Sequence, residues 1–396
     1  MNKSSDQEFD VIVIGAGAAG LMCALTAGQR GRTVLVLDHA NKIAKKVLMS
    51  GGGYCNFTNL NTTAENFFSH NPHFCKSALK RYSPYDFLQL IEKHGIAYRE
   101  KAAGQLFCVE KAHVIRDMLV DECNRAGVKI FSRSEISRID KNNGFTLSTS
   151  RGEFYCESLV VATGGLSIPT LGASGFGYDL ARQFGLNVLQ TRAALVPFTL
   201  DKSWLDRLDG LSGVSLPVTV NCRGNDVQDD LLFTHRGLSG PAILQISAYW
   251  KPGDEVEINL FPQADLCQLL DQRKKQHPKM LLKNSLAELM PKRLAHRCCE
   301  LWFDDRPLAD LSSQAINNIA DQLQHWRLKP SGTEGYRTAE VTLGGVDTDD
   351  VSSRTFEARQ VPGLYFVGEV LDVTGQLGGY NFQWAWASGW SAGQCV

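Results

Sequence analysis

Two cysteines and one histidine stand in settings where their side chains could do chemistry. Cys55 follows three consecutive glycines in the uncharged segment LMSGGGYCNFTN, and Cys108 follows Phe107. An uncharged environment keeps a thiol protonated near neutral pH, so either cysteine could donate a proton to a substrate carbon. A single cysteine is nevertheless more often a small buried residue that only packs in the core. His235, in FTHRGLSGP, could contact a substrate, donate a proton or brace a tight turn.

Three glycines near the N-terminus have the spacing of a dinucleotide-binding turn. In VIVIGAGAAG, the residues Gly15, Gly17 and Gly20 follow a strand-like run and precede an Ala/Leu-rich stretch typical of a helix. The first glycine permits the tight turn, the second lets the backbone approach a pyrophosphate, and the third lets helix and strand pack closely. A second predicted strand, residues 33–37, ends at Asp38, where a carboxylate can accept bonds from ribose hydroxyls. Together these parts predict a βαβ dinucleotide site rather than a structural glycine turn.

The C-terminal part of the chain returns to this nucleotide domain, and the return favours FAD. In GLYFVGEVLDVTGQLGGYN a strand runs into Gly368 and Glu369, and a glycine turn at Gly378 and Gly379 follows. FAD bound in an extended form needs a carboxylate for its ribityl hydroxyls and N–H donors at its isoalloxazine ring. A helix beginning near Tyr380 would direct its positive end at the ring edge where charge develops on reduction. The simpler alternative is a glycine hinge before a packing helix.

Two further glycine-rich segments are predicted to line the cofactor. Segment 48–59 lacks the G-x-x-x-x-G-K-[ST] spacing of a P-loop, so we interpret it as a wall of the flavin site. Its asparagines would bond to the flavin or to their own turn. VATGG, residues 161–165, is expected to bring the backbone close to the cofactor. The predicted cofactor-binding residues are Gly15, Gly17, Ala18, Ala19, Gly20, Asp38, Lys46, Ser50, Gly51, Gly52, Gly53, Asn56, Asn59, Ile136, Thr163, Gly164, Gly165, Gly368, Glu369, Gly378, Gly379, Tyr380 and Asn381.

The segment GASGFGYDLARQFG, residues 172–185, resembles a second nucleotide loop. It lacks a following strand with a terminal acid, so we interpret it as the start of a helix rather than as a nicotinamide-binding domain. If NAD(P)H is the electron donor, it would then bind transiently over the flavin.

A basic segment lies in an otherwise nearly neutral chain. The formal net charge of the 396 residues is −1, yet residues 273–297 carry eight Lys or Arg against one acid, Glu288, a local charge of +7. Such a run of basic residues usually forms a solvent-exposed, lysine-rich face. The asymmetry also suits phosphate contacts to RNA, which position a substrate without reading its sequence. The predicted RNA-binding residues are Arg273, Lys274, Lys275, Lys279, Lys283, Lys292, Arg293 and Arg297.

Patterning along the chain indicates a multidomain protein of the α/β plus β class. β-like pieces separated by turns begin near Ala193, and residues 264–328 are helical and basic. We expect a Rossmann-like FAD-binding domain made of residues 1–192 and 346–396. It would be interrupted by a small antiparallel β-barrel-like domain, residues 193–263 and 329–345, and by a basic helical insertion, residues 264–328.

Composition and cysteine usage suggest a cytoplasmic protein. No apolar run approaches the roughly 18 residues of a membrane span, and the polar start MNKSSDQEFD lacks a hydrophobic signal core. The eleven cysteines contain no C-x-x-C, which argues against a zinc ribbon or a dithiol redox motif, and we expect no metal. The oligomeric state is left open.

Six segments together resemble the BaiN/RdsA family of FAD-dependent oxidoreductases: VIVIGAGAAG, LMSGGGYCNFTN, VVATGG, LFTHRGLSGPAIL, AEVTLGGV and VGEVLDVTGQLGGYNFQWAWASG. The resemblance spans nearly the whole chain and implies an FAD domain interrupted by a β-barrel and a helical insertion. It also implies activities that differ between members, namely reduction of a uracil in ribosomal RNA to dihydrouridine or ring reduction in steroid-like substrates. Two positions depart from the family's usual pattern: Tyr54 stands where many members have arginine, and Cys108 where many have proline.

Three functional hypotheses follow. The leading one is an FAD-dependent oxidoreductase that reduces a uracil C5=C6 bond in RNA, most plausibly 23S ribosomal RNA or its precursor, with hydride from the flavin and a proton from a general acid. The second is an NAD(P)H-dependent reductase of a small unsaturated metabolite. The third, from a different class, is a flavin-binding redox sensor without turnover.

Overall fold

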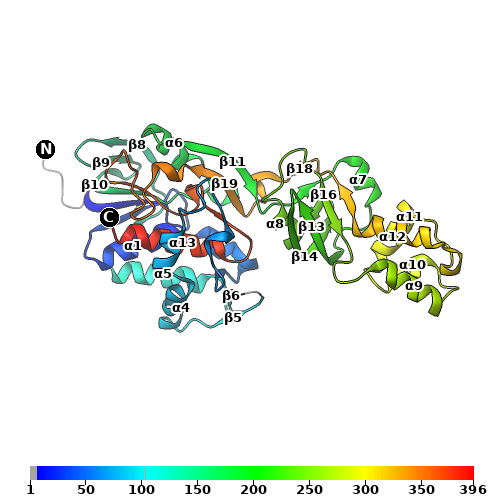
Figure 1. The fold of residues 1–396 in the computed structure, drawn as a ribbon. Helices are drawn as coiled ribbons and strands as arrows, with labels where there is room; N and C mark the ends of the chain where they lie inside the picture. The colour runs from blue at the N-terminus through cyan, green and yellow to red at the C-terminus, as the bar shows by residue number, and fades with distance from the viewer. Residues whose placement is uncertain (1–6, 103) are drawn as a thin grey trace. The chain divides into compact units, whose positions relative to one another are not determined.

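The computed structural model describes residues 7–102 and 104–396, which divide into two compact units (Figure 1). Unit 1 combines the N-terminal part, to Arg192, with the C-terminal part from Val341, and unit 2 is Ala193–Glu340. Each unit has its own hydrophobic core. The two ends of the chain therefore build one unit, and the predicted domain bounds stay a prediction. The first six residues of the polar N-terminal segment lie outside the described residues.

Unit 1 is built on a seven-stranded sheet. Its central strands pair in parallel and are buried, which explains their nearly continuous runs of Val, Ile and Leu. The long strand β10 pairs in parallel with β1 and β20 and antiparallel with β9, so it joins the Rossmann-like part to a β-meander. In sheet order the strands are β7 (Lys129–Phe131), β2 (Val34–Leu37), β1 (Glu8–Ile14), β10 (Gly152–Val161), β9 (Phe145–Thr149) and β8 (Ile136–Lys141), with β20 (Leu364–Phe366) on β10.

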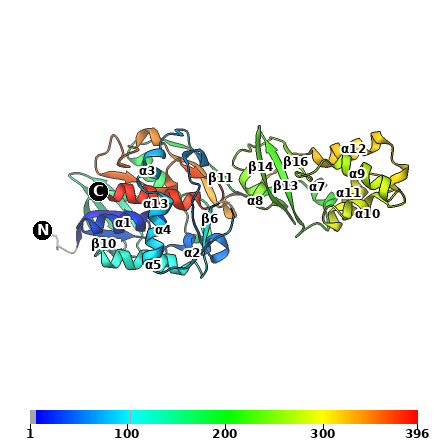
Figure 2. The ribbon, with the colours of Figure 1, turned by 60° about the horizontal axis from the view of Figure 1, so that its bottom comes forward.

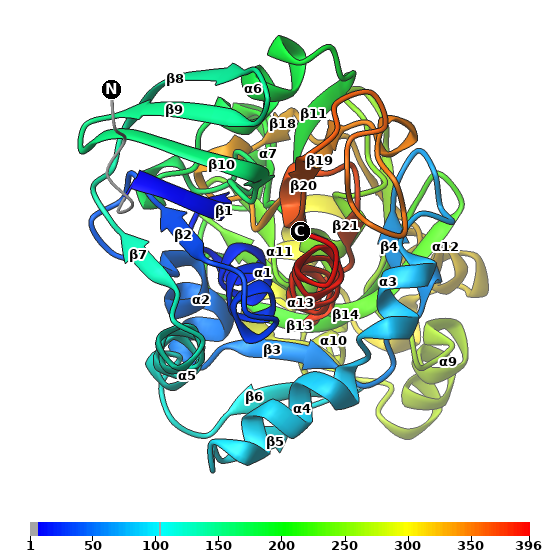
Figure 3. The ribbon, with the colours of Figure 1, turned by 90° about the vertical axis from the view of Figure 1, so that its left-hand side faces the viewer.

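The first and last helices of unit 1 lie side by side on one side of this sheet (Figure 1, Figure 3). Glycines permit the close approach: a Cβ on Gly389 would lie 2.4 Å from the carbonyl oxygen of Ala19, and one on Gly393 would lie 2.6 Å from the Cβ of Thr26. The helices of the unit are α1 (Ala18–Gln29), α2 (Lys45–Met49), α3 (Lys76–Arg81), α4 (Pro84–Lys93), α5 (His113–Arg125), α6 (Phe176–Gln183) and α13 (Tyr380–Gly393).

Three small sheets complete unit 1. One of them carries the segment 48–59 and packs against α13. The strand pairs are β3 (Asn56–Asn59) with β6 (Gln105–Cys108) and β5 (Tyr98–Glu100), β4 (Phe67–Phe68) with β21 (Thr374–Gly375), and β11 (Val188–Ala194) with β19 (Val341–Val346).

Unit 2 contains a seven-stranded antiparallel sheet (Figure 2). We expected a small barrel, but within the described residues the end strands β17 and β18 each pair on one side only, so the sheet has two edges. In order the strands are β17 (Trp326–Leu328), β16 (Val256–Asn259), β13 (Ser215–Cys222), β14 (Asn225–Thr234), β15 (Gly237–Ser239), β12 (Phe198–Thr199) and β18 (Gly332–Thr333).

The helices of unit 2 share one hydrophobic core with this sheet. Pro241 occupies the first turn of a helix, Pro241–Ile246, where its missing N–H is not needed. One local prediction was wrong, because the last three residues of the segment expected to be helical, 326–328, form β17. The helices are α7 (Lys202–Arg207), α8 (Pro241–Ile246), α9 (Leu266–Gln276), α10 (Leu282–Ala287), α11 (Lys292–Trp302) and α12 (Ser313–Gln324).

The division of unit 2 at residues 263/264 stays a prediction. In the part of the chain that the structure describes, no helix is both long enough and apolar enough to cross a membrane.

Candidate active site

The glycine turn after β1 has the geometry of a dinucleotide site. Gly15 has a φ of +108°, and a Cβ there would lie 2.4 Å from the carbonyl oxygen of Ala162. A Cβ on Gly20 would lie 1.9 Å from the carbonyl oxygen of Gly15, so this residue must be glycine for α1 to pack. A Cβ on Gly17, by contrast, would meet nothing within 4 Å. The open space lies at the start of α1, which has no side-chain cap, so its first N–H groups are available to a phosphate.

The Asp38 carboxylate is held in place by backbone N–H groups at the end of β2. One oxygen accepts from Ala16 at 2.8 Å and the other from Ala40 at 2.7 Å. These two bonds orient the carboxylate and leave acceptor capacity on both oxygens for ribose hydroxyls. Ile136, at the start of β8, is half-buried near this strand end, where the N–H of Ser134 donates to the Asp38 carbonyl at 2.9 Å.

The VATGG segment after β10 carries a buried polar atom that needs a partner. Within the described residues, the Thr163 hydroxyl oxygen is buried and makes no hydrogen bond. An unsatisfied buried hydroxyl costs free energy, and this one packs against the start of α6, since a Cβ on Gly177 would lie 2.2 Å from it. Gly164 follows with a φ of +72° and open space around its Cβ position. The half-buried backbone at Gly164, rather than the hydroxyl, is the part of this segment that a dinucleotide could approach.

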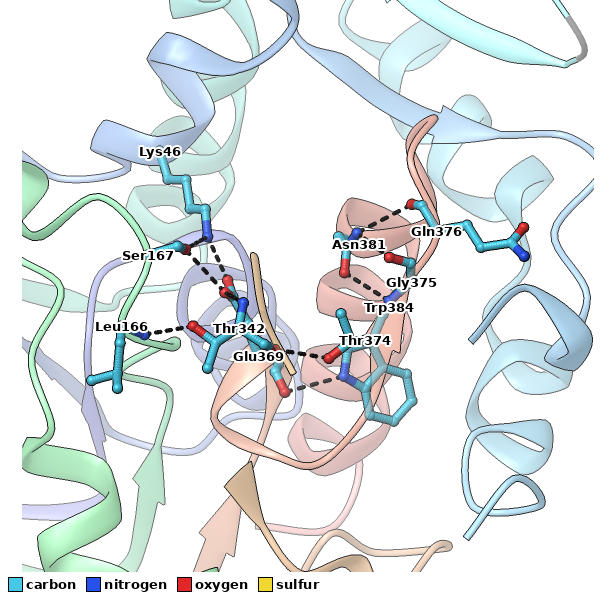
Figure 4. A network of polar contacts seen from close by, with 11 residues as sticks. Lys46, Leu166, Ser167, Thr342, Glu369, Thr374, Gly375, Gln376, Asn381 and Trp384 are labelled. Carbon is cyan, nitrogen blue, oxygen red and sulfur yellow. Dashed lines mark hydrogen bonds and ion pairs between the residues drawn. The ribbon is translucent and has the colours of Figure 1, made fainter. Parts of the chain in front are cut away.

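Glu369 is the centre of a polar network that joins three parts of unit 1 (Figure 4). It lies in a single helical turn, Gly368–Val370, directly after β20. One carboxylate oxygen forms an ion pair with Lys46 at 2.6 Å, and the other accepts from the Thr342 N–H at 3.0 Å and from the Ser167 hydroxyl at 3.2 Å. Lys46 also donates to the Ser167 hydroxyl at 2.7 Å. The network orients Glu369, and a contact between its carboxylate and the ribityl chain stays a prediction.

The start of α13 is built by side chains that bond to the preceding loop. Asn381 exchanges two hydrogen bonds with the backbone of Gly375, both at 2.8 Å, and Asn59 donates to the Gly378 carbonyl at 2.9 Å. Asn56, with its amide oxygen turned toward α13, accepts from the Gly379 N–H at 3.2 Å. The helix has no side-chain cap. The asparagines therefore shape the turn, and the uncapped first turn at Tyr380 offers its N–H groups to a ligand.

The loop of the segment 48–59 requires its glycines. Gly51, Gly52 and Gly53 have φ values of +56°, +67° and +86°, a run that residues with a Cβ rarely adopt. The Ser50 hydroxyl donates to the Val47 carbonyl at 2.8 Å, so it stabilises the loop itself. The loop lies beside β6, because a Cβ on Gly51 would be 2.9 Å from the Phe107 ring, and its role as a wall of the cofactor site stays a prediction.

Comparison with known proteins identifies the family of the chain. The model of the family described as "HI0933-like protein Rossmann domain" matches residues 9–395. The chain belongs to the HI0933-like family. The ribosomal RNA dihydrouridine synthase of Escherichia coli K12 is 56% identical over 391 residues, 98% of each chain, and that of Haemophilus influenzae is 51% identical over 97% of this chain and 98% of its own. The 3-dehydro-bile acid delta(4,6)-reductase of Clostridium scindens is 28% identical over 97% of this chain and 98% of its own.

Membership in the HI0933-like family makes the chain an FAD-dependent oxidoreductase and confirms the predicted family and fold class. The residues present fit the cofactor, because the open Gly17 turn and the oriented Asp38 carboxylate suit a dinucleotide. Two members of the Glu369 network, Ser167 and Thr342, were missed in the sequence, and so was Gln105, whose side-chain amide lies 3.2 Å from that of Asn56. Nothing in their local sequence marks them, although Thr342 lies in the quoted AEVTLGGV segment.

Both candidate cysteines are fully buried in this member of the HI0933-like family. Cys55 and Cys108 have no exposed surface, and burial raises the pKa of each thiol to about 12. The thiols are therefore protonated at neutral pH, as a proton donor must be, but neither sulfur reaches solvent. On β6, Leu106 and Cys108 face the core, while Phe107 points to the opposite face. Both cysteines stay candidate donors only if the loop opens.

His235 does not brace its turn. The hydroxyl of Thr234 does so, because it donates to the Gly237 carbonyl at 3.2 Å and accepts from the N–H groups of Arg236 and Gly237. His235 itself is exposed and makes no hydrogen bond to the residues that the structure describes. The turn-bracing alternative was wrong, and His235 is free to contact a substrate.

Fewer cations of the basic segment in unit 2 are available to contact RNA phosphates than its charge suggests. Five of its eight cations bond to their own chain: Arg273 with Glu288, Lys274 with the Leu311 carbonyl, Lys283 with Asp305, Arg293 with the Gly210 carbonyl, and Arg297 with Glu300 and the Asp209 carbonyl. Lys275, Lys279 and Lys292 are exposed, and their side chains form no ion pair among the described residues.

Gly17 and Gly20 should respond oppositely to substitution. Gly17→Val should keep a melting temperature close to that of the wild-type apoprotein, since its φ of −87° suits any residue and its Cβ has room, yet it should purify without flavin. Gly20→Val should lower the melting temperature, because its Cβ would overlap the Gly15 carbonyl oxygen. Flavin absorbance and thermal melts measure both. Wild-type flavin content in Gly17→Val would contradict the assigned pyrophosphate position.

Thiol labelling should show the burial of the candidate cysteines. In native protein at neutral pH, N-ethylmaleimide should modify the partly exposed Cys267 and Cys395 and spare Cys55 and Cys108, because buried thiols are both protonated and inaccessible. Peptide mass mapping gives the site of each label, and labelling in guanidinium is the control for reactivity. Modification of Cys55 at the same rate as Cys267 would show that the loop opens readily.

Proposed function

We propose that the protein reduces a uracil base in ribosomal RNA to dihydrouracil, using bound FAD. The observation that carries this proposal is the identity of 56% and 51%, over nearly the full length, with two proteins named ribosomal RNA dihydrouridine synthase. The reductase named for a bile acid is more distant, at 28% identity. An RNA substrate is therefore better supported than a small unsaturated metabolite, and no observation favours a sensor without turnover.

Reduction of the C5=C6 bond needs a hydride at one carbon and a proton at the other. Reduced FAD, when bound, would supply the hydride. The uncapped N-terminus of α13 would stabilise negative charge on the flavin ring if, as we propose, the ring lies at this end of the helix. The Glu369–Lys46 pair would orient the carboxylate toward the ribityl chain. We further propose NAD(P)H as the transient electron donor.

The proton donor is proposed among three residues. Cys55 and Cys108 have the protonation state that a general acid needs but no access to solvent, whereas His235 has access. The RNA, which we propose to be 23S ribosomal RNA or its precursor, would place the protein in the cytoplasm.

Loss of the gene should remove one dihydrouridine from ribosomal RNA. Mass mapping of RNA from cells with and without the protein should show the modification lost and then restored by the wild-type chain. The Gly17→Val variant, which should lack flavin, should fail to restore it. An unchanged dihydrouridine content in the deletion strain would overturn the proposed function.

RNA binding by the basic segment should depend on its three unpaired lysines. Changing Lys275, Lys279 and Lys292 together to Gln should reduce the salt dependence of RNA affinity, by about 0.7 in log–log slope for each lost phosphate contact on single-stranded RNA. The matched control changes three exposed lysines elsewhere in unit 2, namely Lys202, Lys251 and Lys329. Equal slopes for the two triple variants, measured by fluorescence anisotropy, would contradict a specific role for the segment.

A further inference from the structure

A partly exposed aromatic ring lies on the outer face of the small sheet of β3, β6 and β5. Along β6 the side chains alternate, so the buried Leu106 and Cys108 point into the core while Gln105 and Phe107 point away from it. Phe107 is not part of the hydrophobic core of unit 1. Its ring lies beside the glycine loop, since a Cβ on Gly51 would be 2.9 Å from it.

Two exposed cations lie on the same face of the sheet as this ring. Arg99 is the cross-strand partner of Phe107, so the two side chains share a face. The ammonium of Lys101 lies 5.6 Å from the centre of the Phe107 ring. Both cations are exposed, and their side chains form no ion pair among the described residues. The intervening Glu100 is opposite Leu106 on the other face, and its carboxylate accepts from the Gly104 N–H at 3.0 Å.

A second aromatic residue with its own cation adjoins Phe107. The Tyr54 carbonyl accepts from the Cys108 N–H at 3.0 Å, which places Tyr54 next to β6. The Lys111 ammonium lies 3.9 Å from the centre of the Tyr54 ring, so a positive charge is present at the position where many relatives are expected to carry arginine. Residues 41–64 around the loop include three lysines and no acid, and Glu110 is the acid next to Lys111.

This surface adjoins the proposed position of the flavin ring. Asn56 is the β3 partner of Phe107, and the Asn56 amide reaches the Gly379 N–H at the start of α13. A Cβ on Gly378 would lie 3.1 Å from the Gln105 amide nitrogen, on the same face of β6 as Phe107. Aromatic rings beside unpaired cations are the groups that bind unpaired nucleotides, through base stacking and phosphate contacts.

We propose that Tyr54, Arg99, Lys101, Phe107 and Lys111, together the Phe107 surface, bind the unpaired RNA nucleotides that flank the target uracil. Phe107 and Tyr54 stack on bases, and the three cations contact phosphates. Lys101 and Lys111 are flexible and can leave the ring faces for a phosphate when a base arrives. The inference rests on the proposed function and assigns the substrate contacts nearest the flavin to unit 1 rather than to the basic segment.

The test measures the affinity of FAD-loaded protein for a uridine-containing single-stranded oligoribonucleotide and for a matched duplex. Tyr54→Leu and Phe107→Leu should each weaken single-strand binding by about tenfold, the loss expected from one base–aromatic stack, and leave duplex binding nearly unchanged. The pair Lys101→Gln and Lys111→Gln should lower the salt slope by about 1.4, for two phosphate contacts on a single strand.

The matched control changes two lysines that lie over phenylalanine rings elsewhere in unit 1, Lys129 over Phe9 and Lys141 over Phe145. Its affinity and salt slope should equal those of the wild type. Flavin content and melting temperature confirm that each variant folds. If the wild type binds the single strand and the two leucine variants bind it equally well, the Phe107 surface is wrong while the proposed function stands. If the wild type binds no RNA, both fail.

Discussion

The close packing of α1 against α13 is the constraint on which the site depends. These helices come from opposite ends of the chain, and Gly389 and Gly393 allow their backbones to approach to a distance that a Cβ would prevent. Gly20 likewise allows α1 to pack closely against the Gly15 carbonyl in the turn before it. As a result, the open turn at Gly17 and the uncapped start of α13 belong to one unit. An extended dinucleotide needs such groups at both of its ends.

In unit 1, side chains hold the loops of the site in place, and backbone N–H groups remain available to bind the cofactor. The side chains of Asp38, Asn59 and Asn381 form hydrogen bonds with neighbouring backbone groups. The Glu369 carboxylate likewise accepts a hydrogen bond from the Thr342 N–H. The N–H groups at the two helix starts are free of such caps. Backbone donors fixed by rigid helices cost little reorganisation when a charged cofactor arrives, which suits a flavin whose charge changes on reduction.

The parts of the site set by local backbone constraints could be predicted from the sequence. Gly15, Gly17 and Gly20 after a strand allow few other structures, and the return of the chain at Gly368 and Gly379 was visible for the same reason. Long-range pairing could not be predicted: Lys46 and Glu369 are 323 residues apart. Nor could the exposure of side chains be predicted: the sequence left open whether Cys55 and Cys108 are proton donors or buried apolar residues, and whether His235 contacts a substrate or braces a turn. Charge along the sequence likewise did not show that five of eight cations already have partners.

In the proposed reaction, a flavin bound to groups from both ends of unit 1 would reduce a uracil ring. Anaerobic mixing of fully reduced, FAD-loaded protein with ribosomal RNA from a strain lacking the protein tests that link in a single turnover. The account predicts that the flavin is reoxidised in step with the appearance of one dihydrouridine per flavin. Flavin that stays reduced in the presence of this RNA, or that is reoxidised without any dihydrouridine being formed, would contradict it.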